Sequence, residues 1–194
     1  MLNFNTFKKK YTVTVPKNIK VLYCDEKNII TFVGPLQKKS LELKVKVFLI
    51  SSLNLVAITA VPVFGTSIID FKNAKSIQGT TVAQIKQTLI ETTYTLYHRL
   101  NLVGVGYRVF AYEQVKNQIY FKLGYSHLIY FKVPNSLNTH CHKFTKLFVF
   151  GNCSFDLLTQ TVAQIRACRL PEPYKGKGIL HDQEKIILKK GKKI

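Results

Sequence analysis

The hexapeptide TVAQIK at Thr81–Lys86 recurs almost unchanged as TVAQIR at Thr161–Arg166. Each copy lies in a segment whose apolar residues are three or four positions apart, which predicts an amphipathic helix in both places. Short strand-like runs precede each helix, so the chain reads as strands followed by a helix, twice. We interpret this as an internal duplication. It predicts an α+β fold of two tandem similar domains, each an antiparallel-rich β-sheet with one helix packed on a face.

Two helices are expected around these repeats, over residues 81–100 and 155–169. Thr81 with Gln84 fits a capping box at the start of the first helix, and Ser154 is a suitable N-cap for the second. The apolar stripe of the first helix consists of Val82, Ile85, Leu89, Leu96 and Leu100. That of the second consists of Phe155, Leu158, Val162 and Ile165.

The strands are predicted from short runs of β-branched and aromatic residues. They are expected at residues 11–15, 19–22, 29–33, 102–110, 118–123, 128–133 and 146–150. Two dipeptides outside the hexapeptide also recur in similar form and support the duplication. Val15-Pro16 matches Val133-Pro134, and Val33-Gly34 resembles Phe150-Gly151. The expected division is a first domain at 1–100, a second at 101–180 and a basic C-terminal extension at 181–194.

The segment from Val47 to Phe64 contains no charged residue and reaches the lower limit of length for a membrane-spanning helix. Ser51-Ser52, Asn54 and Pro62 interrupt it, and its β-branched content favours strands. We therefore expect a β-hairpin here, with a transmembrane helix as the alternative.

The charge balance indicates an anionic partner. The 194 residues include 29 lysines and arginines against 10 aspartates and glutamates, a net charge of +19. Nucleic acid or an anionic membrane surface would offset this self-repulsion. Hydrophobic residues make up 46% of the chain, which excludes a disordered basic protein.

The four cysteines are scattered without a C-x-x-C pair, which is typical of free thiols in a reducing compartment.

The first residues resemble neither a secretory signal nor a transit peptide, so the protein works where it is made or has lost a presequence. The abundance of Phe, Tyr, Ile, Asn and Lys suggests an AT-rich genome, as in organelles.

The strongest candidate site is PEPYKGKGI at Pro171–Ile179. Its prolines stiffen the chain, its glycines allow close approach to a partner, and its lysines and N–H groups offer donors to an anion. Tyr174 adds a flat face for a base or ribose. The chain then continues as KIILKKGKKI from Lys185. A polyphosphate backbone fits this pattern, and the alternative is a solvated loop with a cationic tail.

The sequence gives little indication of catalysis, metal binding or dinucleotide binding. No grouping suggests a nucleophile with its base, so no enzyme activity and no cofactor are expected. Asp182 and Glu184 are interpreted as solvated turn charges. His140-Cys141-His142, with Cys153 following, permits a metal site, but the spacing fits a polar cluster at a strand end better. Gly104-Val105-Gly106 lacks the context of a dinucleotide loop and is expected within a strand, where its glycines relieve crowding.

Three stretches resemble a known family: LVGVGYRV at Leu102–Val109, LGYSHLIYFKVP at Leu123–Pro134, and PEPYKGKGI with its lysine tail. They are similar to ribosomal large-subunit protein six of the bacterial type. The resemblance is strong from about Leu102 to Lys193, and weaker but collinear from Val15 to Leu100. It implies two similar α+β domains and no catalysis. It also implies binding of large-subunit rRNA, chiefly through the second domain, near the sarcin–ricin loop and the stalk base where translation factors dock.

Together, the residues and the resemblance predict a structural ribonucleoprotein component that supports translation. Its expected partners are large-subunit rRNA and neighbouring large-subunit proteins, with translation factors nearby and no stable membrane insertion. The divergent first half and the composition favour a mitochondrial ribosome in the matrix, with a plastid as second choice. The alternative is a basic membrane-associated protein anchored by residues 47–64. The predicted RNA-binding residues are Arg166, Arg169, Tyr174, Lys175, Gly176, Lys177, Gly178, Lys185, Lys189, Lys190, Lys192 and Lys193.

Overall fold

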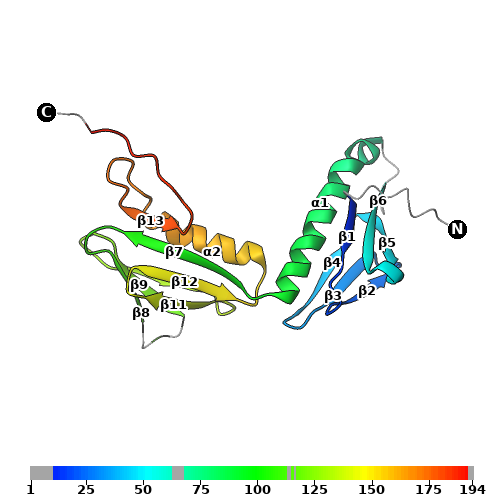
Figure 1. Cartoon of the computed structure of the whole chain (residues 1–194), viewed down its shortest axis with the longest axis horizontal. Coiled ribbons are helices and arrows are strands. Elements are labelled where there is room, and N and C mark those ends of the chain that lie inside the picture. Colours follow the sequence, from blue (N-terminus) through cyan, green and yellow to red (C-terminus); the bar gives the residue numbers. More distant parts are fainter. Residues whose placement is uncertain (1–10, 63–67, 113–114, 116, 192–194) are drawn as a thin grey trace. The chain divides into compact units, whose positions relative to one another are not determined.

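The computed structural model describes residues 11–62, 68–112, 115 and 117–191. The chain divides into two units, residues 1–94 and 95–194, each with its own core (Figure 1). Both units follow one plan: a first strand, a three-stranded meander, a hairpin that pairs with the first strand, and a helix. This repeated order confirms the predicted α+β fold with two similar halves.

In unit 1 the first strand and the hairpin form one antiparallel sheet, in the order β1-β6-β5, and the meander forms a second, β2-β3-β4. Helix α1 packs mainly against β6, and its apolar face closes the core. The described elements are β1 (Thr12–Thr14), β2 (Lys20–Cys24), β3 (Ile29–Val33), β4 (Lys38–Glu42), β5 (Val45–Ile50), the short 3-10 helix Ser51–Leu53, β6 (Leu55–Pro62) and α1 (Ile68–Thr93).

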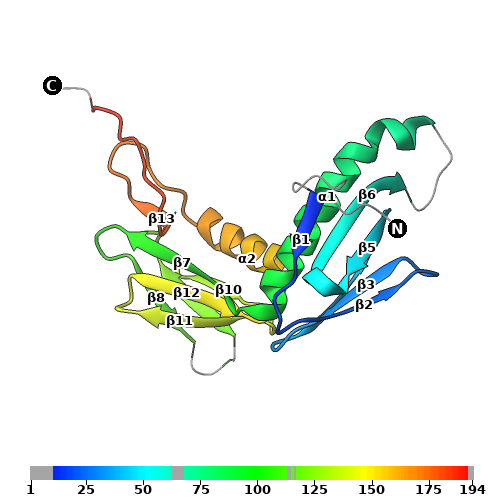
Figure 2. The same ribbon diagram turned by 45° about the vertical axis from the view of Figure 1, so that its right-hand side comes forward.

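Unit 2 has the same two sheets with one strand added. The larger has the order β11-β12-β7-β13, the meander has the order β10-β9-β8, and α2 covers one face of the larger sheet (Figures 1 and 2). The described elements are β7 (Leu96–Val103), β8 (Arg108–Ala111), β9 (Gln118–Lys122), β10 (Ile129–Lys132), β11 (Asn138–His142), β12 (Lys146–Gly151), α2 (Phe155–Ala167) and β13 (Gly178–His181).

The repeated hexapeptide occupies equivalent positions in the two cores. The hydroxyl of Thr81 donates to the carbonyl of Ile77 at 2.8 Å, and that of Thr161 to the carbonyl of Leu157 at 3.0 Å. The recurring Val-Pro dipeptides, in contrast, do not occupy equivalent positions, because Val15-Pro16 follows β1 whereas Val133-Pro134 follows the meander strand β10. The buried positions of the repeat are Thr81, Val82 and Ile85 in α1, and Thr161, Val162 and Ile165 in α2.

The predicted bounds of the first helix were wrong at both ends. Helix α1 begins at Ile68 and ends at Thr93, so Thr81 lies in its middle and its hydroxyl bonds within the helix instead of capping it. Leu96 and Leu100 belong to strand β7, where Leu100 is fully buried. The division between the units accordingly falls after Tyr94, earlier than the expected boundary after residue 100.

The expected strand over 102–110 is interrupted by a turn. Gly104 has φ +152° and Gly106 has φ +75°, and the chain turns there between β7 and β8. A methyl group on Gly104 would lie 2.8 Å from the ring of Tyr107, which is itself buried. The glycines therefore shape a turn around this ring and are not spacers within a strand.

The uncharged segment after Val47 forms the expected hairpin. Strands β5 and β6 pair in antiparallel register, and Asn54 between them adopts the left-handed conformation with φ 48°. This contradicts a helical membrane anchor in the part of the segment that the structure describes. None of the helices in the described ranges combines the length and the apolar character that crossing a membrane requires.

Candidate nucleic-acid interface

The PEPYKGKGI segment forms a closed loop between α2 and β13. The N–H of Glu172 donates to the carbonyl of Lys177, and the N–H of Gly176 donates to the carbonyl of Glu172, both at 2.9 Å. Gly176 has φ +68°, a conformation that side chains disfavour. The N–H of Ile179 then bonds the carbonyl of Arg169 at 2.9 Å, which fastens the base of the loop. The loop is therefore held by its own backbone.

The C-terminal tail runs beside this loop. The N–H of Lys189 donates to the carbonyl of Pro173 at 2.9 Å. The side chain of Leu188 lies against Gly176, where an added methyl group would come within 3.3 Å of it. Both ribbon views show the tail returning past the loop (Figures 1 and 2). Loop and tail lysines that are distant in sequence thus lie at one end of unit 2.

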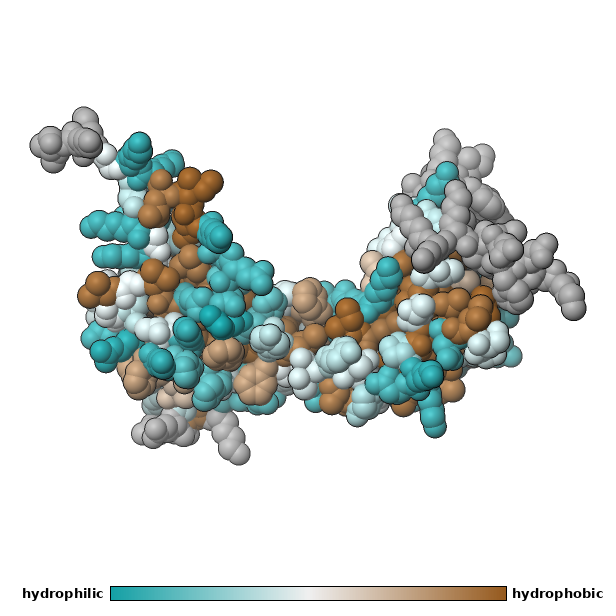
Figure 3. Space-filling model, viewed as in Figure 1, coloured by the Kyte–Doolittle hydropathy of each residue, from teal (hydrophilic) through white to brown (hydrophobic). Residues whose placement is uncertain are grey.

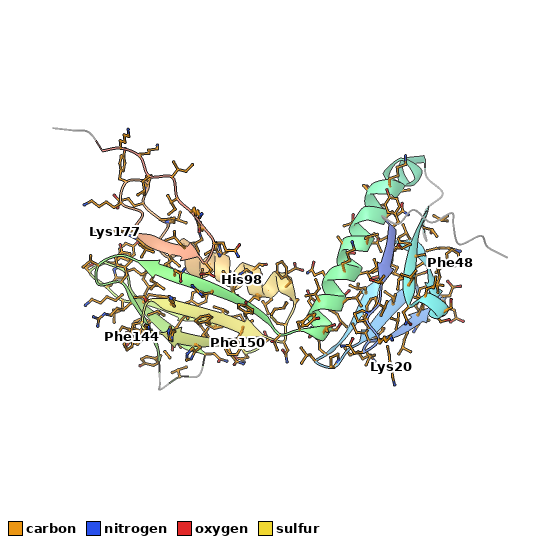
Figure 4. The ribbon with its side chains drawn as sticks, in the orientation of Figure 1. Lys20, Phe48, His98, Phe144, Phe150 and Lys177 are labelled. Atoms are coloured by element: carbon orange, nitrogen blue, oxygen red, sulfur yellow. The ribbon has the colours of Figure 1, made fainter. Side chains whose placement is uncertain are left out.

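This end of the unit presents cations and one aromatic ring to solvent. Tyr174 is 54% exposed, and Lys175, Lys185, Lys189 and Lys190 are exposed as well. Figure 3 shows apolar residues among hydrophilic ones here, and Figure 4 labels Lys177, which is half-buried beside the buried Gly178. Within the described part of the chain, no ion pair involves a loop or tail lysine. Their charges are therefore available to a partner, whereas Lys192 and Lys193 lie outside the described residues.

The two predicted arginines have partners within the protein. Arg166 forms a two-pronged ion pair with Glu184, in which Nε donates to Oε2 at 3.0 Å. The guanidinium of Arg169 lies over the ring of Tyr125, 4.5 Å from its centre. The structure therefore brings the loop and the tail together, and it engages the side chains of both arginines in contacts within unit 2.

The interpretation of the tail acids as solvated turn charges was incomplete, because Asp182 is exposed in a turn as expected but both acids also form ion pairs. Asp182 pairs with Arg99 of β7 at 2.7 Å, and Glu184 pairs with Arg166 of α2. Hydrogen bonds from Arg166 and from the N–H of His181 lower the pKa of Glu184 despite its partial burial. The same pair raises the pKa of Arg166. These two ion pairs fasten the start of the tail, and nothing in the local sequence marks them.

Acidification is expected to loosen this attachment. Because the pKa of Glu184 is lower in the folded chain, its stabilising effect is complete above its ordinary value of 4.5 and is lost as the pH falls through the folded-state value. The His181 N–H donates to Glu184 at 3.1 Å, and the hydrogen-exchange protection of this N–H, corrected for the intrinsic rate, should fall as the pH drops from 4.5 through the folded-state pKa. A Glu184→Gln variant should lack this dependence, and an identical pH dependence of protection in the wild type and the variant would contradict the prediction.

The histidine–cysteine cluster lies on strand β11. His140 and His142 share its exposed face, and Cys141 points the other way, where burial raises the pKa of its thiol. Cys153 is buried in the core of unit 2. No group of three or more His, Cys, Asp or Glu in the described ranges is placed to hold a metal ion.

The described residues form two α+β units of one plan, with an exposed lysine-rich loop and tail at one end of the second, and this arrangement defines a basic two-unit scaffold. The chain is 36% identical over 182 residues to large ribosomal subunit protein uL6 of Mycoplasmoides gallisepticum, covering 93% of this chain and 92% of that protein. It is 35% identical over 183 residues to uL6 of Geobacter sulfurreducens and of Geotalea uraniireducens, covering 94% of this chain and 95% of each relative.

No family model matches the chain. Identity of this level over nearly the whole length nevertheless shows that the chain belongs to the uL6 family of large ribosomal subunit proteins. This confirms the resemblance found in the sequence. Members of the family are structural components of the ribosome and not enzymes.

Proposed function

We propose that the protein binds large-subunit rRNA through residues 171–178 and the tail that lies beside them. The observation that carries this proposal is the hydrogen bond between Lys189 N–H and the Pro173 carbonyl, because it joins two lysine-rich segments into one surface. That surface combines unpaired ammonium groups with the exposed ring of Tyr174. Closely spaced phosphates are the partner that such a surface fits best.

The geometry favours recognition of RNA shape over a base code. Lysine ammonium groups contact phosphates and fix position, but they carry no sequence information. The two loop glycines let the backbone approach the RNA, and Tyr174 offers a ring for stacking on a base or ribose. Gly176, Gly178, Arg166 and Arg169 were predicted to bind RNA, and we propose that they also support the surface through contacts that hold the loop and the tail in place.

The place of binding and the compartment are further parts of the proposal. Membership of the uL6 family supports a position near the sarcin–ricin loop and the stalk base, close to where translation factors dock. The AT-rich composition supports a mitochondrial ribosome, with a plastid ribosome second. Sedimentation of a tagged copy with the mitochondrial large subunit, and its release by RNase, is the expected result. Cosedimentation with plastid or cytosolic particles instead would overturn the mitochondrial assignment.

Replacing both loop lysines, Lys175→Ala with Lys177→Ala, is expected to weaken binding to an rRNA fragment that contains the sarcin–ricin region. Each lost phosphate contact reduces the slope of log K against log salt by about 0.7–0.9, so the double variant should flatten it by roughly 1.4–1.8. The measurement is a titration by fluorescence anisotropy at several salt concentrations.

A matched control is Lys44→Ala with Lys46→Ala in unit 1, since both lysines are exposed and the charge change is the same. This control should keep the wild-type slope. Equal flattening by both double variants would indicate a general charge effect, and an unchanged slope in the first would remove the loop from the interface.

A further inference from the structure

A row of aromatic rings crosses the meander sheet of unit 2. Phe110, Tyr120 and Tyr130 are direct cross-strand partners on β8, β9 and β10. The rings of Phe110 and Tyr120 stack with centres 5.0 Å apart, and Tyr120 and Tyr130 are 6.1 Å apart. Phe144, from the turn between β11 and β12, extends the row at 5.0 Å from Phe110. We call these four residues the aromatic row.

This row lies on the outer face of the sheet. The alternate residues Val109, Ile119 and Phe121 are fully buried, so the core already has its apolar face. The outer face of such a sheet usually carries polar residues. Here, Tyr130 is 55% exposed and Phe144 is 52% exposed, so both ends of the row are open to solvent.

The backbone around Phe144 holds its ring in this position. Lys143 and Phe144 both have positive φ, 50° and 56°, which is rare for bulky residues. The carbonyl of Phe144 accepts a hydrogen bond from the N–H of Val109 at 2.8 Å, which ties the turn to β8. Strained backbone of this kind persists where the surroundings enforce it, and it clusters at binding sites.

Exposed cations surround the aromatic row: Arg108, Lys122, Lys132 and Lys143. Arg108 and Lys122 are direct cross-strand partners, an arrangement of like charges that destabilises a sheet unless an anion is bound. The described residues of β8, β9 and β10 include no aspartate or glutamate. Because the face presents aromatic rings and cations together, its best-matched partner carries both flat rings and negative charge.

We propose that the aromatic row binds an unpaired stretch of RNA, with bases stacked on Tyr130 and Phe144 and phosphates on the surrounding cations. Exposed aromatic rings beside basic groups are the means by which proteins hold single strands. Figure 4 shows β7 and β12 between Phe144 and Lys177, so this surface is separate from the loop and tail. It adds a contact for single-stranded nucleotides to the structural contact proposed above. A face with four cations, whose strands carry no acid among their described residues, suits RNA better than an apolar protein segment.

The test uses the full chain with Tyr130→Leu and Phe144→Leu. Leucine keeps the apolar surface but removes the stacking ring, so it separates base stacking from hydrophobic protein docking. The probe is a fluorescently labelled ten-nucleotide oligouridine, with an RNA duplex of the same length in parallel. We expect oligouridine affinity to fall at least tenfold while duplex affinity changes less than twofold. Tyr130→Phe, which keeps the ring, should bind as the wild type does.

Crosslinking gives an independent readout. Photocrosslinking of a 4-thiouridine oligonucleotide should map to peptides containing Tyr130 or Phe144. Unchanged oligouridine affinity in the double leucine variant, in protein with a wild-type circular dichroism spectrum, would overturn the proposal, as would crosslinks confined to residues 171–191. If the variant keeps RNA affinity but fails to assemble with neighbouring proteins, the face is a protein contact instead. The loop variant Lys175→Ala with Lys177→Ala should retain the crosslink, so failure of one site is distinguishable from failure of the other.

Discussion

Gly178→Ala should destabilise unit 2 and weaken RNA binding more than the loss of any single lysine. A methyl group at this position would lie 2.5 Å from the Cα of Pro171, 2.7 Å from its nitrogen and 2.9 Å from the carbonyl carbon of Leu170. All three are backbone atoms, which cannot move aside as a flexible side chain can. Gly178 also has φ +158°, at the edge of the range that side chains rarely adopt. The loop and β13 would therefore have to separate.

Separation here would release more than one contact. Gly178 pairs with Val103, and the next residue, Ile179, is fully buried and bonds to Arg169. We expect the free energy of unfolding to fall by about 2–3 kcal/mol, which is typical of backbone strain combined with lost packing. RNA affinity should fall about tenfold or more, since loop and tail would no longer share one surface. Hydrogen exchange at 178–181 and an RNA titration measure the two effects.

Gly191→Ala is the matched control for this substitution. Gly191 is exposed, and a methyl group there would meet no heavy atom within 4 Å. Its stability and RNA affinity should match those of the wild type. If Gly178→Ala behaves in the same way, close packing of the loop on Pro171 is not needed for binding.

Lys39→Met is expected to destabilise unit 1 strongly. Glu91, in the last turn of α1, is only 1% exposed, and its carboxylate forms an ion pair with Lys39 of β4. Gln87 donates to the same carboxylate at 3.0 Å, and Gln37 donates to the Glu91 carbonyl at 2.9 Å. Removal of the lysine would leave a buried carboxylate without this cation. The expected loss is about 3 kcal/mol, as found when one member of a buried pair is removed.

The measurement is denaturant unfolding of the full chain, with hydrogen exchange of α1 and β4 to assign the loss to unit 1. The double variant Lys39→Met with Glu91→Leu should recover much of the loss, because it removes both charges together. A single variant as stable as the wild type would show that Lys39 does not support the Glu91 charge. RNA binding by the loop of unit 2 should be unaffected.

The sequence predicted the architecture well where one periodicity was unambiguous. The repeated hexapeptide has one pattern of burial in both helices, so it identified the duplication correctly. The end of α1 was misplaced because Leu96 and Leu100 are four residues apart, a spacing that fits one face of a helix and equally one face of a strand. The spacing of apolar residues alone cannot distinguish a helix from a strand here. The pairing of β7 with β12 shows that this segment is a strand.

The candidate site was only partly visible for a related reason. The loop could be proposed as a binding segment from the sequence alone, because its alternating glycines and lysines are adjacent in the chain. The pairs Arg99–Asp182 and Arg166–Glu184 and the aromatic row depend on which residues folding brings side by side. Phe110, Tyr120 and Tyr130 recur at even intervals, but only strand register shows that they form one row.

The late position of β13 in the chain has a consequence for biogenesis. This strand completes the larger sheet of unit 2 by joining β7, which is synthesised long before it. Unit 1 makes its sheets from its own nearer segments, so it can form while the rest is still being translated. A product that terminates before β13 would therefore contain a folded first unit but would lack both the last strand of the larger sheet in unit 2 and the tail that lies beside the loop. If the loop and tail bind rRNA as proposed, incorporation into a particle requires that translation of the polypeptide has passed residue 181.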